Sequence, residues 1–112
     1  MNAPMIDPTY NQTMIDKLTM ISVLNDLDSG DNIAKIEYKV FTSNDRRFTN
    51  KWYKEYLVVS FKDGAKTIRD ITGLTKGETR RITCMVIAGV DYNDPKTNAI
   101  LPTEEDGWIL VK

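Results

Sequence analysis

The chain has no histidine, and its 112 residues include one cysteine, Cys84. Without histidine it lacks the commonest general base and metal ligand, so Ser–His and Cys–His nucleophile pairs are excluded within one chain. A lone cysteine forms no internal disulfide, which fits a reducing compartment. No apolar run approaches the roughly 20 residues that span a bilayer, and the N-terminus lacks the pattern of a secretory signal. We therefore expect a cytoplasmic protein with no membrane segment.

Patterns that would support metal or cofactor chemistry are also missing. Residues 26–31 depart from a calcium loop, because Gly30 and Asp31 stand in reversed order for that motif. The acidic stretch 104–106 has no metal-ligand spacing, and Cys84 lies in an apolar segment typical of a small core residue. The sequence therefore predicts no cofactor, no metal site and no catalysis.

Charge is divided along the chain despite a net charge of −1. Residues 35–81 carry twelve Lys and Arg against six Asp and Glu, and the remaining residues carry three against ten. A chain divided in this way can present a positive face, so an anionic partner remains compatible with the low overall pI. The separate blocks of opposite sign are also compatible with self-association into a homo-oligomer.

The composition, 41% hydrophobic and 28% charged, is that of one globular domain. Residues 1–10 hold Pro4 and Pro8 and are predicted as an irregular arm, leaving residues 11–112 as a single β-rich domain. Residues 11–30 fit two structures. Asn11 suits a helix cap and favours a helix, whereas the β-branched residues within 18–24 would suit an extra strand.

From Ile33 onward the pattern indicates strands. Residues 34–40 alternate apolar and charged, and residues 52–62 place Tyr53, Leu57, Val59 and Phe61 on one side. Asp63-Gly64 suits a two-residue hairpin turn, after which residues 65–71 should return antiparallel.

Two further strands are predicted. Residues 80–90 are apolar on both faces and suggest a central strand, and residues 108–111 form a last short one after a loop. The predicted fold is mainly β: a small five-stranded antiparallel barrel or strongly curved sheet, with an N-terminal helix or extra strand. This element order resembles the oligonucleotide-binding barrel class, which implies binding through the second and third strands and the first and last connections.

The most distinctive segment is the run from Arg46 to Tyr56, with four cations and four aromatic residues. A two-residue turn pairs residues whose numbers sum to 127, so Arg69 would lie opposite Val58 and share its face. Cations hold a nucleic-acid backbone while aromatic rings stack on bases. The predicted nucleic-acid-binding residues are Arg46, Arg47, Phe48, Lys51, Trp52, Lys54, Tyr56 and Arg69.

The sequence therefore predicts a non-catalytic protein that binds single-stranded DNA or RNA through a basic and aromatic face. The alternative is a protein–protein interaction module, such as an inhibitor, assembly factor or structural subunit. In that case the same aromatic residues anchor an interface, and the cations meet an acidic protein surface.

Overall fold

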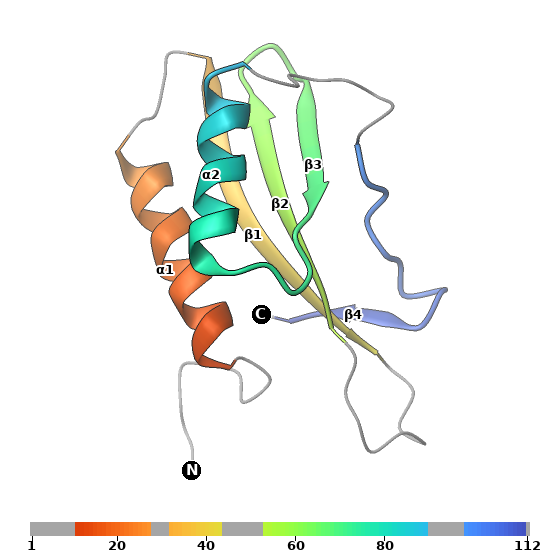
Figure 1. The fold of residues 1–112 in the computed structure, drawn as a ribbon. Coiled ribbons are helices and arrows are strands. Elements are labelled where there is room, and N and C mark those ends of the chain that lie inside the picture. The colour runs from red at the N-terminus through yellow and green to blue at the C-terminus, as the bar shows by residue number, and fades with distance from the viewer. Residues whose placement is uncertain (1–10, 28–31, 44–52, 90–97, 112) are drawn as a thin grey trace.

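The computed structural model describes residues 11–27, 32–43, 53–89 and 98–111. Within them the chain forms a small α+β fold, a four-stranded antiparallel sheet with two helices (Figure 1). The strand order across the sheet is β3-β2-β1-β4. The elements are α1 (Gln12–Asp26), β1 (Ile33–Ser43), β2 (Tyr53–Phe61), β3 (Lys66–Asp70), α2 (Lys76–Ile87) and β4 (Trp108–Leu110).

Both helices lie side by side on one face of the sheet and run in the same direction (Figure 1). α1 begins near the lower end of the molecule, and α2 begins partway along the sheet (Figure 1). The main core lies between the helices and the sheet. Its largest fully buried apolar side chains are Ile21, Val40, Leu57, Val59 and Ile71.

The helix predicted after Asn11 is confirmed, and the competing strand is not formed. Asn11 caps α1 by accepting a hydrogen bond from the Met14 N–H at 2.9 Å, which satisfies a backbone group left free at a helix start. Met14, Lys17 and Ile21 recur at helical spacing and are buried. Residues 28–30, the last part of the segment predicted as helix or strand, lie outside the described residues.

The alternation predicted for the first strand holds in β1 for Ile36, Tyr38 and Val40, which are all buried. Ala34 was expected on the same side but is exposed. The reason is an irregularity in the pairing with β2: Ile33 faces Phe61 and Lys35 faces Ser60, which leaves Ala34 as the extra residue of a bulge.

The hairpin between β2 and β3 forms, but with a three-residue turn instead of the predicted two. Phe61 and Ala65 pair across the turn, with the Phe61 N–H donating to the Ala65 carbonyl at 2.9 Å. Gly64 takes a φ of +93°, typical of the glycine that closes such a turn. Leu57 therefore faces Arg69, and Val58 faces Ile68. The predicted register was wrong by one residue, which moves each β3 side chain to the opposite face.

The strand predicted over residues 80–90 is wrong, because residues 76–87 form α2. Thr75 caps this helix, and the Glu78 side chain bonds back to the Thr75 N–H at 3.0 Å. Thr79, Thr83 and Val86 form the buried stripe at helical spacing. Cys84, expected in the core, is exposed on α2.

The last predicted strand is confirmed as β4, which pairs antiparallel with Phe41, Thr42 and Ser43 of β1. Among the described residues the sheet has four strands, with β3 and β4 at its edges. The sheet is therefore not closed, and the predicted five-stranded barrel is not confirmed. No described helix is long and apolar enough to cross a lipid bilayer.

Candidate functional site: a buried ion pair beneath a pocket and a basic helix face

Three of the predicted nucleic-acid-binding residues lie in described strands. Lys54 and Tyr56 share the face of β2 that points away from the helices, as expected from the alternation. Tyr56 is only 4% exposed, and its ring meets Phe41 edge-on with centroids 5.8 Å apart. A ring buried in this way offers no free face for stacking on a base.

Arg69 does not join that face. Its pairing with Leu57 directs it to the helix side of the sheet, at the edge strand β3. Its Nη1 donates to the Asn98 side-chain oxygen at 2.8 Å and to the Ile68 carbonyl at 3.1 Å. The structure thus separates Arg69 from Lys54 and Tyr56, because the hairpin register differs from the predicted one.

Lys54 has an aromatic neighbour that the sequence argument did not include. Its ammonium nitrogen lies 4.5 Å from the centroid of the Trp108 ring, a cation–π contact between β2 and β4. The remaining predicted residues lie outside the described part of the chain: Arg46, Arg47, Phe48, Lys51 and Trp52.

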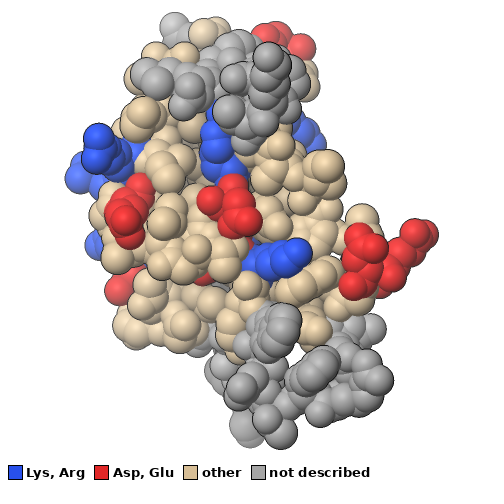
Figure 2. All heavy atoms as spheres, turned by 45° about the vertical axis from the view of Figure 1, so that its right-hand side comes forward, with Lys and Arg blue, Asp and Glu red and all other residues tan. Residues whose placement is uncertain are grey.

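A second group of cations lies on α2. Lys76, Arg80 and Arg81 are exposed, and none of them forms an ion pair with another described residue. By contrast, the side of the molecule that carries residues 98–107 shows cations and anions interspersed (Figure 2). On α2 the exposed cations outnumber the acidic residues, since Glu78 is the one carboxylate in this helix.

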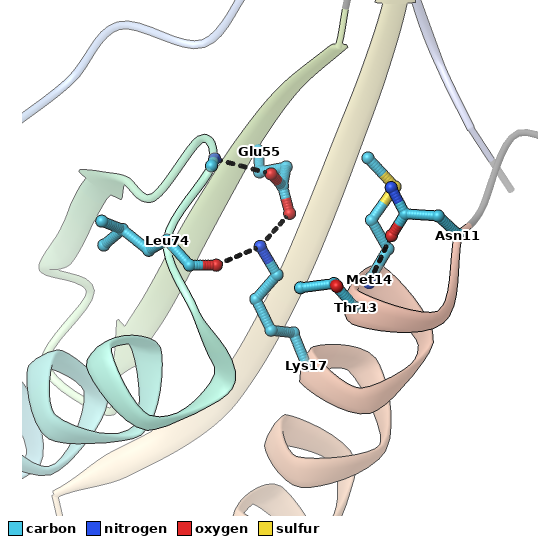
Figure 3. Close-up of a pocket in the computed structure, with 7 residues that line it drawn as sticks. Asn11, Thr13, Met14, Lys17, Glu55 and Leu74 are labelled. Atoms are coloured by element: carbon cyan, nitrogen blue, oxygen red, sulfur yellow. Dashed lines mark hydrogen bonds and ion pairs between the residues drawn. The ribbon is translucent and has the colours of Figure 1, made fainter.

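The most highly organised polar cluster centres on Lys17 of α1 and Glu55 of β2. Their side chains form an ion pair and are 1% and 5% exposed. The Lys17 ammonium also donates to the Leu74 carbonyl at 2.9 Å (Figure 3). The pair therefore joins α1, the centre of the sheet and the turn that precedes α2.

Glu55 is held by further hydrogen bonds. Its Oε1 accepts from the Tyr38 hydroxyl as well as from Lys17, and its Oε2 accepts from the Gly73 N–H at 2.9 Å. The backbone N–H of Glu55 donates to the Thr72 hydroxyl oxygen at 2.9 Å. A buried carboxylate requires such partners, because an unpaired charge away from water is very costly.

A pocket of about 230 Å³ opens onto this pair. The start of α1 forms one wall through Asn11, Thr13 and Met14, and Gly73 and Leu74 form the other (Figure 3). Lys17 and Glu55 lie between the two walls. Ligand pockets commonly combine apolar side chains with a few converging polar groups, and the lining of this pocket has that composition.

The sequence argument missed both residues, although a signal was present. Glu55 occupies an odd-numbered position in a strand whose other odd positions, such as Leu57 and Val59, are apolar. Lys17 stands between Met14 and Ile21 on the buried stripe of α1. One cation and one anion at core positions of neighbouring elements indicate a buried pair.

One titratable group on the outer face is perturbed. Burial, and secondarily the carboxylate of Asp70, raises the pKa of the Tyr56 hydroxyl above its usual value of 10.0. Within the described ranges, no group of three or more Cys, Asp or Glu side chains is placed to hold a metal ion. No family model matches the chain, and no match is found among curated proteins or solved structures.

Proposed function

We propose that the protein is a non-catalytic domain that binds single-stranded nucleic acid, with its basic helix face meeting the phosphate backbone. The observation that carries this proposal is a set of exposed cations on α2 that form no ion pair with another described residue: Lys76, Arg80 and Arg81. Lys76 and Arg80 are four residues apart and therefore neighbours on the helix surface. Cations free of acidic partners are available to replace the counterions of a phosphate chain.

The location of this helix adds support. The turn that precedes α2 bonds to the first part of β2, because the Glu55 N–H donates to the Thr72 hydroxyl and the Glu55 carboxylate accepts from the Gly73 N–H. The chain between β1 and β2 contains Arg46, Arg47 and Lys51, which we propose as further phosphate contacts. We propose that Phe48 and Trp52 stack on bases. Tyr56 was also predicted to stack, but its ring is buried and we do not propose it for this role.

Two matched double variants test the proposal by fluorescence anisotropy with a labelled single-stranded oligonucleotide. Arg80→Ala/Arg81→Ala removes two exposed charges from α2, and Lys35→Ala/Lys62→Ala removes two exposed charges from other surfaces. Each lost phosphate contact should reduce the slope of log K against log salt by about 0.7 for a single strand. We expect a reduction of about 1.4 in the first variant and little change in the second.

Equal weakening by both double variants would show that net charge alone matters and would contradict a site on α2. Absence of binding at micromolar protein in low salt would end the proposal. Duplex DNA of equal length should bind more weakly, because paired bases offer no free ring faces to Phe48 and Trp52.

An acidic protein surface would use the same cations, so a polyanionic peptide separates the two partner classes. Poly-aspartate matches the charge of an oligonucleotide but has no bases to stack. The proposed function predicts that poly-aspartate binds more weakly than an oligonucleotide of the same charge. If it binds as strongly, the cations of α2 meet a protein partner.

A further inference from the structure

The pocket beside α1 contains a pair of charged side chains that are almost fully buried. The side chains of Lys17 and Glu55 are 1% and 5% exposed, yet both residues line the pocket (Figure 3). Replacing such a pair by apolar residues is often neutral or stabilising in other proteins, so a buried ion pair is weak evidence for a role in stability alone. Because the pair lines a pocket, we infer a role in ligand binding.

Most of the groups that can form a hydrogen bond with a ligand in this pocket are donors. The Lys17 ammonium has three N–H groups; Glu55 and the Leu74 carbonyl accept from two of them, and the nitrogen also lies 5.9 Å from the centroid of the Tyr38 ring. Asn11 uses its side-chain oxygen to cap α1, so its amide N–H groups remain. Thr13 adds an exposed hydroxyl. A ligand that fits this set must present hydrogen-bond acceptors.

The acceptors of the pocket are largely occupied. Glu55 Oε1 already accepts from Lys17 and Tyr38, and Oε2 accepts from Gly73. Lys17 neutralises the Glu55 carboxylate, so a ligand with one negative charge meets little net repulsion. A second negative charge on the ligand would face Glu55 without a further cation among the residues that line the pocket.

We propose that this pocket binds the carboxylate of a small organic acid. The ligand oxygens would accept hydrogen bonds from the third N–H of Lys17, the Asn11 amide and the Thr13 hydroxyl. The volume of about 230 Å³ is below the 300–1,000 Å³ typical of drug-sized ligands, which fits a molecule of a few heavy atoms. The inference uses neither α2 nor residues 44–52 and does not depend on the proposed function.

The test is an NMR titration of the ¹⁵N-labelled protein at constant ionic strength with acetate, acetamide and inorganic phosphate as probes. Acetate should give saturable shifts at the amides of Thr13, Lys17 and Gly73. Acetamide is close to acetate in shape but uncharged, so it should bind at least about tenfold more weakly, as expected for losing a charge-assisted hydrogen bond. Phosphate should also bind more weakly because of its second charge.

Asn11→Asp is the informative variant. Asp caps helices as well as Asn does, so the fold should be retained, while the new carboxylate faces the incoming anion. We expect acetate binding to weaken by about tenfold or more. Gln12→Glu adds the same charge one residue away at a side chain that does not line the pocket, and it should change binding less than about threefold.

Four results would overturn the proposal. The first is an acetate response that rises linearly without saturating. The second is acetamide binding equal to that of acetate. The third is that Asn11→Asp and Gln12→Glu weaken acetate binding equally, which would mean that long-range charge repulsion alone explains the effect. Binding of phosphate more tightly than acetate would replace the carboxylate class by a dianion and so also contradict the proposal.

Discussion

Lys17 and Glu55 form an ion pair from which water is almost excluded, and each also bonds to the turn that precedes α2. Lys17 donates to the Leu74 carbonyl at 2.9 Å, and Glu55 accepts from the Gly73 N–H at 2.9 Å. One pair of side chains thus fixes the position of α1, of β2 and of the start of α2 relative to one another. The contribution of this pair to the free energy of unfolding can be measured directly.

Lys17→Met should destabilise the protein by about 3–5 kcal/mol, because it leaves the buried Glu55 carboxylate without its cation. The free energy of unfolding in urea measures the effect. Lys35→Met is the matched control: Lys35 forms a surface ion pair with Glu37 at 3.4 Å, and its side chain is 61% exposed. That substitution should cost no more than about 1 kcal/mol. Similar costs for the two variants would show that the buried pair contributes no more than an exposed one.

Two glycines should respond to alanine with opposite signs. Gly64 has a φ of +93°, a conformation that L side chains rarely adopt, so Gly64→Ala should destabilise the hairpin by about 1–2 kcal/mol. Gly77 lies inside α2, where an added Cβ would meet only the Thr75 hydroxyl oxygen at 4.0 Å. Gly77→Ala should therefore stabilise by about 0.5–1 kcal/mol. Thermal unfolding of both variants measures the difference, and shifts of the same sign would contradict the turn geometry.

At low pH the cap of α2 should contribute less to the stability of the fold. The Thr75 backbone N–H, followed by its hydroxyl, lowers the pKa of the Glu78 carboxyl below its usual 4.5. A lowered folded-state pKa gives stability that is present above the unfolded-state value and lost as the pH falls through the folded one. Glu78→Gln retains a capping side chain but does not titrate. Urea midpoints from pH 7 to pH 3 should fall less in this variant, and an unchanged acid response would disprove the assignment.

At high pH the ionisation of Tyr56 should destabilise the fold. Burial and the Asp70 carboxylate raise the pKa of its phenol, so the folded state favours the neutral form. The resulting stability is fully present below the usual pKa of 10.0 and is lost as the pH rises through the folded-state value. Tyr56→Phe should reduce the loss of stability between pH 9 and 11, measured by urea unfolding. Tyr53→Phe removes a hydroxyl from a half-buried position of the same strand and serves as the control for the substitution itself.

Much of the sheet could be predicted because the alternation in β1 and β2 reports which face is buried. Ile36, Tyr38, Leu57 and Val59 all lie where the period-two pattern places them. The cap at Asn11 likewise carried its own local signal. These features depend on interactions within one element or between adjacent elements, and such interactions produce recognisable patterns in the sequence.

The errors have physical causes. Residues 80–90 include β-branched residues and are apolar on two faces, a pattern that a short buried strand and a helix share. The capping box of Thr75 and Glu78 was the signal that separates the two. In the hairpin, one additional turn residue moved Arg69 to the opposite face of the sheet. Local patterns place Lys17 and Glu55 each at a buried position, but the two residues are far apart in the chain and these patterns do not specify that they meet.

The pairing of β4 with β1 has a consequence for synthesis of the chain. Leu110 pairs with Phe41, so the two partners are separated by 69 residues of sequence. At about 5–20 residues per second, β1 leaves the ribosome roughly 3–14 seconds before the strand that covers this part of its edge. During that interval the backbone groups of Phe41–Ser43 lack their β4 partner, which leaves this edge open to pairing with a neighbouring nascent chain.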